Sequence, residues 1–238
     1  MVSKYERGVL VFSDDSEMEE IQRIEKSIRR SLPALGISCD QGVVLASATR
    51  SSQSSLMEKD NLSSVFNLGE RAGMVSAGRV ADAQSLAEGM RDKALEDISK
   101  YGELEDVNVL VKEVAEDVRE TRQEIPYRPY GVQMIVGGVN GGGKPELYKV
   151  DLDGVVTSWS AVAVGSQTDE IMTELESEYE RSNDIEECTQ IAVNKLLKYS
   201  SVGSEGLSVA TITENSDLYR LGTDEIEEHK LDKGDQDE

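Results

Sequence analysis

The spacing of apolar residues predicts that strands come first along the chain and helices follow. Five short apolar segments have the length of strands: 8–12, 34–39, 42–47, 64–68 and 72–77. Asp40 and Gln41 form a tight hairpin signal between segments 34–39 and 42–47. These two segments are predicted to share a first sheet with segments 64–68 and 72–77, which follow the loop at 49–55. Segments 79–100 and 106–122 repeat apolar residues every three or four positions, which predicts two amphipathic helices.

The second half of the chain repeats this order. Four strand-length segments are joined by Gly-rich or Asp-Gly turns: 130–138, 146–150, 155–158 and 161–164. Helices are predicted over 168–181 and 184–199, and a last pair of strands over 208–213 and 218–221. Alternating strands and paired helices in this order predict an α+β fold, a four-layer αββα sandwich.

A separate helix is predicted ahead of the first hairpin, over 17–30. Ile21, Ile24 and Ile28 recur on one face, so this helix should bury only an isoleucine stripe. Ser16 and Glu19 have the spacing of a capping box at its start. The chain then divides into an N-terminal segment with the first strand (1–16), one domain (17–222) and an acidic C-terminal tail (223–238).

The net charge of the chain limits the partners that it can bind and indicates the salt conditions in which it works. The 238 residues include 47 acidic and 25 basic side chains, a formal net charge of −22, so a nucleic-acid backbone would be repelled. Concentrated salt screens the repulsion between these acidic side chains, so the acidic excess indicates a halophilic source. An ordinary acidic protein stays an alternative. The sequence contains no apolar run near 18 residues and no secretory leader, which predicts a cytoplasmic protein.

Several possible sites have simpler structural interpretations. Residues 138–144 match the first seven positions of a phosphate-binding loop, but Pro145 stands where the Mg²⁺-binding hydroxyl is needed, so a hairpin turn is expected. Cys39 and Cys188 lack zinc-site spacing and are expected to be buried fillers. His229 is the only histidine and is expected to be a solvated tail residue, and the acidic doublets lack calcium-loop spacing. We expect no metal and no cofactor.

Two motifs carry a resemblance to a known family. Residues 76–86 read Ser-Ala-Gly-Arg-Val-Ala-Asp-Ala-Gln-Ser-Leu, and residues 128–132 read Arg-Pro-Tyr-Gly-Val. The first resembles the strand-to-helix junction of proteasome core-particle subunits, and the second resembles the form found in α-type subunits. The similarity extends, with gaps, from Tyr5 to about Leu221.

The resemblance implies that this chain has no catalytic site. Active members use an N-terminal threonine whose own α-amino group is the base. Alignment puts that threonine at Leu32, the catalytic aspartate near Ala48 and the catalytic lysine at Ser64. All three functional groups are therefore absent, which predicts that the chain is not itself an enzyme.

The resemblance also implies a gate. Tyr5, Glu6 and Arg7 stand where α-type subunits carry the Tyr-Asp-Arg segment that opens or closes the axial pore. Asp14 replaces a family proline and Arg23 a family tyrosine, both of which help to hold the open gate. Ser64 also occupies the position of the lysine that receives the carboxylate of an activating ATPase, and Lys59 is a weaker substitute.

We therefore predict a non-catalytic α-type proteasome subunit in a seven-membered outer ring that gates substrate entry. Its expected partners are other α-type subunits, β-type subunits and an activating AAA ATPase. Two alternatives stay open: a hydrolase of the N-terminal-nucleophile fold with an unrecognised nucleophile, and a stand-alone ring scaffold. The sequence does not decide whether the chain forms its own ring or mixes with a second α-type chain.

Overall fold

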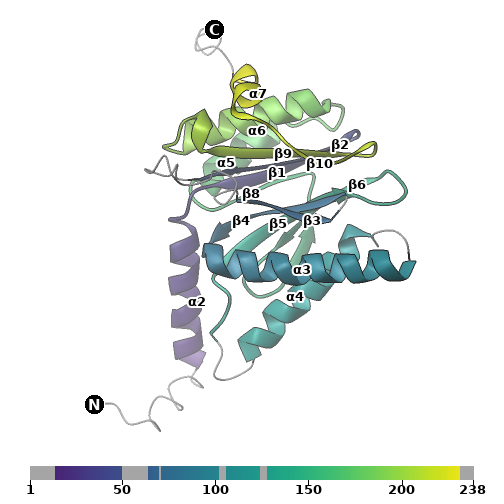
Figure 1. Cartoon of the computed structure of the whole chain (residues 1–238). Coiled ribbons are helices and arrows are strands. Elements are labelled where there is room, and N and C mark those ends of the chain that lie inside the picture. The colour runs from purple at the N-terminus through teal and green to yellow at the C-terminus, as the bar shows by residue number, and fades with distance from the viewer. Residues whose placement is uncertain (1–13, 50–63, 70, 102–105, 124–127, 231–238) are drawn as a thin grey trace, which may run out of the picture.

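Two stacked antiparallel sheets with helices on both outer faces make up the protein (Figure 1). The computed structural model describes residues 14–49, 64–69, 71–101, 106–123 and 128–230. The predicted αββα sandwich is confirmed. The strand expected at 8–12 lies outside the described residues.

The first sheet has the strand order β10-β9-β2-β1-β8. Its members are β1 (Ala34–Cys39), β2 (Gly42–Ala48), β8 (Ala161–Val164), β9 (Leu207–Thr213) and β10 (Ser216–Arg220). Every residue of β1 and β2 is buried, because one face meets the second sheet and the other meets helices. The predicted hairpin is confirmed, with Cys39 opposite Gly42.

The second sheet has the order β3-β4-β5-β6-β7. Its members are β3 (Val65–Gly69), β4 (Ala72–Gly78), β5 (Val132–Val139), β6 (Pro145–Val150) and β7 (Val156–Ser158). The prediction that residues 34–77 form one sheet is wrong. The free edge of β2 pairs with β9, with Gly42 opposite Thr213, so β3 and β4 join β5 instead. Apolar spacing predicts a strand but does not identify its distant partner.

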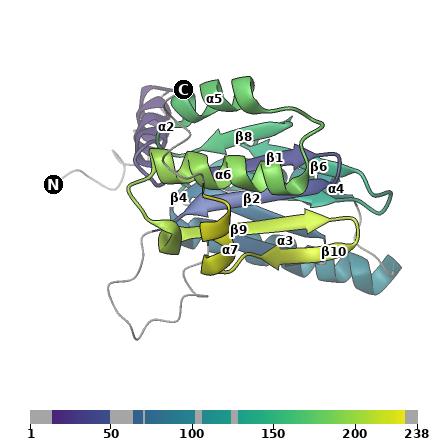
Figure 2. The ribbon, with the colours of Figure 1, turned by 90° about the horizontal axis from the view of Figure 1, so that it is seen from above.

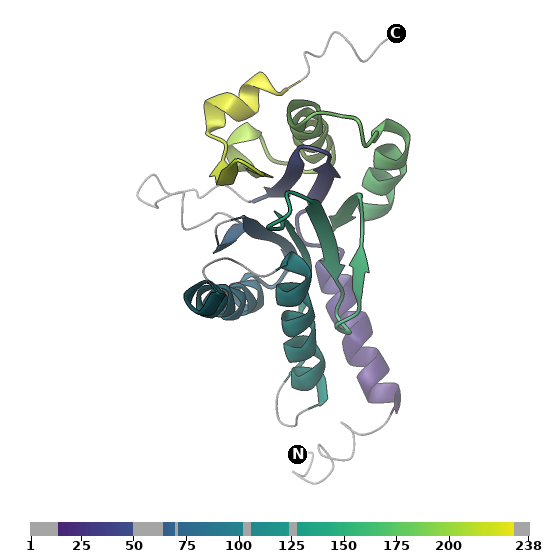
Figure 3. The same ribbon diagram turned by 90° about the vertical axis from the view of Figure 1, so that its right-hand side faces the viewer.

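Paired helices complete the outer layers (Figure 3). Helices α3 (Val80–Tyr101) and α4 (Val107–Gln123) cover the second sheet. Helices α5 (Thr168–Glu178) and α6 (Ile185–Tyr199) cover the first sheet, as the view from above shows (Figure 2). A third apolar cluster fills the space between the sheets. No helix in the described ranges is long and apolar enough to cross a membrane.

Helix α2 (Asp14–Ile28) stands at one end of the strands, and its N-terminal turns point away from the first sheet (Figure 1). Ile28 is buried, Ile24 and Ile21 are half-buried, and the other residues from 22 to 27 are exposed, which confirms the isoleucine stripe. The helix already includes Asp14, so Ser16 lies inside it and the predicted cap is wrong. It ends two residues before the expected Arg30, where the Ser31 amide and hydroxyl both donate to the Ile28 carbonyl.

The expected acidic tail begins as a folded helix. Residues Thr223–Glu228 form α7, and Ile226 packs into the cluster between the first sheet and α6. The Gly222 amide and the Tyr219 hydroxyl both donate to the Glu225 carboxylate and thereby fix the start of this helix. The interpretation of residues 223–228 as tail is therefore wrong. Residues 231–238 lie outside the described part of the chain.

Candidate functional site at the start of the first strand

The three positions aligned with catalytic residues lie at one end of the sandwich. Leu32 precedes β1, Ala48 ends β2 and Ser64 precedes β3. The Ala48 amide donates to the Pro33 carbonyl at 2.9 Å. The Ser64 hydroxyl lies 2.8 Å from the hydroxyl of Thr49, the residue after Ala48. The fold therefore brings these positions together. Leu32 and Ala48 present alkyl side chains where active members have a threonine and an aspartate, and the Ser64 hydroxyl, paired with that of Thr49, replaces the lysine amine.

The segment after β8 fits closely against this end. Gly165 has a φ of 99°, and a Cβ there would lie 2.7 Å from the Leu32 carbonyl oxygen, so only glycine allows this approach. The next residue, Ser166, donates its amide to the Ser31 carbonyl at 3.0 Å. This turn holds the junction of α2 and β1 against the start of α5.

A cavity of about 290 Å³ lies beside this junction, between α2 and the sandwich. Its lining combines three residues of α2 with residues from both sheets and from the start of α5: Glu25, Ile28, Arg29, Gln133, Lys149, Asp151, Ala163, Gly165, Thr168 and Asp169. Asp151 is its most constrained acid. Burial alone would raise the pKa of Asp151, but hydrogen bonds from the Gln133 side chain and the Leu152 amide, together with Lys149, lower it below the ordinary value.

The polar groups of the cavity are largely paired with one another. Lys149 lies 3.1 Å from Asp151, and the Thr168 hydroxyl donates to the Gly165 carbonyl at 2.8 Å. Arg29 lies 3.6 Å from Asp169, and both side chains are well exposed, so this pair contributes little. The cavity is polar, and among its described lining residues the hydroxyl is that of Thr168, which donates to a backbone carbonyl rather than to a base.

The two family motifs meet at a second junction. Both terminal nitrogens of Arg128 donate hydrogen bonds to the carboxylate of Asp82, and the Gly131 amide donates to the same carboxylate at 2.8 Å. The Arg79 amide donates to the Gly131 carbonyl, and a Cβ on Gly78 would lie 2.3 Å from that oxygen. Burial would raise the pKa of Asp82, but the bonds from Arg128 and Gly131 lower it overall. The motif residues therefore join the start of α3 to the start of β5.

The predicted gate and pocket residues are only partly described. Tyr5, Glu6, Arg7 and Lys59 lie outside the described residues, and Asp14 begins α2 with a side chain that is not described. Arg23 is on the exposed side of α2. Ser64 lies with Leu32 and Ala48 at the end of the sandwich, as described above. The gate and the activator pocket stay predictions.

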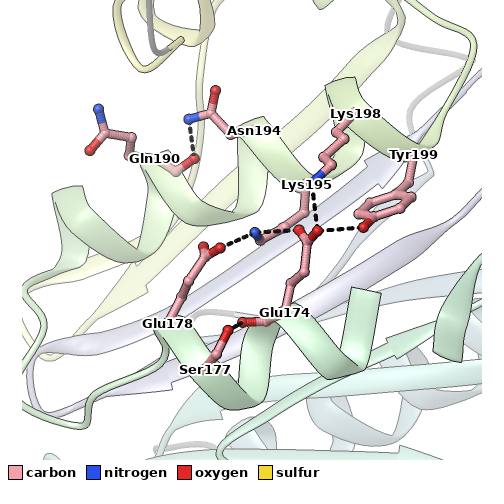
Figure 4. Close-up of polar contacts among 8 residues, drawn as sticks. All are labelled: Glu174, Ser177, Glu178, Gln190, Asn194, Lys195, Lys198 and Tyr199. Carbon is pink, nitrogen blue, oxygen red and sulfur yellow. Dashed lines mark hydrogen bonds and ion pairs between the residues drawn. The ribbon is translucent and has the colours of Figure 1, made fainter. Parts of the chain in front are cut away.

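Sequence reasoning missed a charged cluster between α5 and α6 (Figure 4). Lys195 is only 6% exposed and donates to Glu174 and Glu178, while Lys198 and the Tyr199 hydroxyl also donate to Glu174. Burial would raise the pKa of Glu174, but these donors lower it to about 2. The i,i+4 spacing of the two glutamates was a usable signal, but it gives no indication that α6 supplies their partner.

The other candidate sites resolve into structural features. At residues 138–144 the Asn140 side chain accepts from the Gly142 and Lys144 amides in a hairpin turn between β5 and β6, which confirms the expected turn. Cys39 and Cys188 are buried and free, as expected. His229 is half-buried at the end of α7 and its carbonyl accepts from Asn194, so its interpretation as a solvated tail residue is wrong. Within the described ranges, no group of three acidic, cysteine or histidine residues could hold a metal ion.

The fold and this end of the sandwich define a class of protein, the αββα sandwiches, in a form without the catalytic side chains. Comparison with known proteins is more specific. The family described as "Proteasome subunit" matches residues 28–212. The chain therefore belongs to the proteasome subunit family, which confirms the resemblance carried by the two motifs.

Similar proteins come from salt-loving archaea. The chain is 31% identical to "Proteasome subunit alpha 2" of Haloarcula marismortui over 227 residues, which covers 94% of this chain and 92% of that protein. It is 33% identical to "Proteasome subunit alpha" of Natronomonas pharaonis over 229 residues, covering 94% and 89%. It is 33% identical to "Proteasome subunit alpha 2" of Haloferax volcanii over 212 residues, covering 88% and 84%.

Proposed function

We propose that the chain is a non-catalytic α-type subunit of the proteasome core particle, in the outer ring that gates entry to the proteolytic chamber. The names of its relatives support the α type. The observation that carries the proposal is the end of the sandwich, where Leu32, Ala48 and Ser64 stand in place of the threonine, aspartate and lysine that active members use. The chain assembles with other proteasome subunits, and it contributes architecture rather than chemistry to the particle.

The position of α2 also supports this role. An N-terminal nucleophile must be the first residue of a processed chain. Here Ser31 links α2 to β1 through bonds to Ile28 and Ser166, so residues before Leu32 are part of the folded structure. The segment ahead of α2 is then available to line the axial pore with Tyr5, Glu6 and Arg7. At Ser64 a hydroxyl replaces the lysine expected to receive an ATPase tail, which removes a charge-assisted hydrogen bond to the tail's carboxylate.

Co-expression with a β-type subunit from a related haloarchaeon tests the proposal. We expect a particle with the sedimentation of a stacked-ring complex, and peptidase activity that disappears when only the β-type threonine is replaced by alanine. The chain alone should retain its full N-terminus in intact-mass measurements. Peptidase activity of the chain alone, lost on replacing one of its own Ser or Thr residues, would favour the hydrolase alternative. Rings that never include the β-type subunit would favour the scaffold alternative.

A further inference from the structure

Strand β3 forms one edge of the second sheet. β4 pairs with one side of β3, and no strand of the described residues lies on its other side. The pairing with β4 is regular from Val65 to Asn67, and the register then shifts before Gly69. Val65 and Asn67 are two positions apart, so their backbone groups point to the same side of the strand. The backbone groups of an edge strand can pair with any extended chain that meets them.

Two arginines from different layers bond to the carbonyl groups of this edge. Arg91 of α3 donates its Nε at 3.0 Å and a terminal nitrogen at 2.8 Å to the Asn67 carbonyl. Arg220 of β10 donates to the Val65 carbonyl at 2.8 Å. α3 belongs to the outer helix layer and β10 to the first sheet, so the two side chains reach β3 from both of its faces (Figure 1). Two acceptors that another strand would need are therefore already bonded.

The other three edges of the two sheets differ from β3. β7 and β8 have only three and four residues. β10 has a register shift between Ser216 and Tyr219, and it carries the charge of Asp217. Short, irregular or charged strands pair poorly with other chains. β3 has no charge of its own, because residues 61–69 are all uncharged in a chain where 30% of residues are charged. The two arginines supply the protection that its sequence lacks.

We propose that Arg91 and Arg220 together close the edge of β3 against strand pairing, and that the partner they exclude is a second copy of this chain. The charge pattern favours this partner. Two β3 edges facing each other bring no like charges into opposition, whereas most other surfaces of the chain are acidic. Such a pair uses the same edge on both copies and closes at two. The arginines thus leave contacts between copies to other surfaces.

The double variant Arg91→Met, Arg220→Met tests the proposal in the full-length protein. Methionine keeps much of the apolar length of each side chain but cannot donate to a carbonyl. Sedimentation at equal protein concentration should give a weight-average mass about twice that of wild type, and dilution should reverse the increase. Hydrogen exchange of a peptide that spans 64–69 should slow, because a paired edge protects its backbone amides. An unchanged mass, or a higher mass without slower exchange in this peptide, would overturn the proposal.

Two further variants separate an opened edge from a damaged fold. Adding Asn67→Lys to the double variant restores no bond to a carbonyl, but it places a charge at an exposed position of β3 and should return the mass to the wild-type value. The matched control, Lys112→Met with Arg181→Met, removes two exposed cations from other elements and should leave the mass unchanged. Both double variants make a chain of net charge −22 more acidic, so repulsion alone predicts weaker association in each. Association that persists with Asn67→Lys, or that is equal in the control, would refute the assignment.

Discussion

Replacing Lys195 by methionine tests how the two outer helices are held together. Methionine keeps most of the apolar length of the side chain but removes its ammonium group. The group that disappears lies 2.6 Å from Glu174 and also contacts Glu178 (Figure 4). The variant therefore leaves two carboxylates close together at the contact of α5 and α6, with one shared cation missing.

The magnitude follows from how much water reaches the cluster. Removing one partner of a fully buried ion pair costs about 3 to 5 kcal/mol. Here the lysine side chain is 7% exposed, while Glu174 and Glu178 are 24% and 46% exposed, so part of the lost interaction is replaced by water. Glu174 also keeps Lys198 and Tyr199. We expect a loss of about 2 to 3 kcal/mol in the free energy of unfolding, or about 4 to 12 °C in melting temperature.

The loss should depend on pH in a definite direction. The folded-state pKa of Glu174 is about 2, below its ordinary value of 4.5. The ionised carboxylate therefore adds stability above pH 4.5, and this contribution is lost as the pH falls through about 2. In Lys195→Met the folded-state pKa of Glu174 moves up. The stability difference between wild type and variant should then shrink as the pH falls from about 5 to 2.

Urea unfolding at fixed high salt measures the effect, and Lys198→Met is the matched control. Lys198 is on the same helix and contacts the same carboxylate, but its side chain is 54% exposed, so we expect a loss of less than about 1 kcal/mol. A Lys195→Met variant no less stable than Lys198→Met, or a difference from wild type that is the same at pH 3 and pH 7, would refute the reasoning.

Four further predictions concern other parts of the structure. Arg128→Lys should lower the free energy of unfolding by about 1 to 2 kcal/mol in urea, because an ammonium cannot hold both oxygens of Asp82; unchanged stability would contradict this. Gly165→Ala should destabilise by about 1 to 3 kcal/mol, since φ is 99° and a carbonyl oxygen occupies the space. Its control, Gly89→Ala on the exposed side of α3, should stabilise by about 0.5 to 1 kcal/mol, and equal effects would reject the argument. Assembly should weaken in dilute salt, because a net charge of −22 per chain is screened over about 10 Å at 0.1 M and about 3 Å at 1 M, which sedimentation across a salt series checks. In a reconstituted core particle, Ser64→Lys should raise the affinity for an activator tail peptide by about tenfold to a hundredfold, and no gain would mean that Lys59 or a different pocket already supplies the charge, or that this subunit receives no such tail.

Most elements of the fold could be predicted from the sequence because this sandwich buries its sheets on both faces. The strand predicted over 161–164 has the observed bounds of β8, and most other elements differ by one to three residues at an end. Helix α7 was missed because four acidic residues surround the single buried Ile226. Local composition indicated a tail, whereas one well-placed apolar residue was enough to anchor the helix.

The candidate site was less predictable, for a different physical reason. Alignment identified Leu32, Ala48 and Ser64, and the fold brought them to one end of the sandwich. The cavity beside them depends on side chains from α2, both sheets and α5, whose meeting depends on tertiary packing. Lys195 was missed similarly, because a lysine is almost never fully buried unless it is paired, and its partners are on another helix.

The loss of catalytic groups and the presence of α2 are physically linked. A nucleophile that uses its own α-amino group must follow a cleaved bond, so the residue before it cannot be needed by the fold. Here Ser31 ends α2 by donating to Ile28, and its carbonyl accepts from Ser166 at 3.0 Å. Cleavage before Leu32 would detach α2 and break this continuous path from helix to strand. A threonine at position 32 would thus still have an amide nitrogen, and the side chain alone could not restore the chemistry.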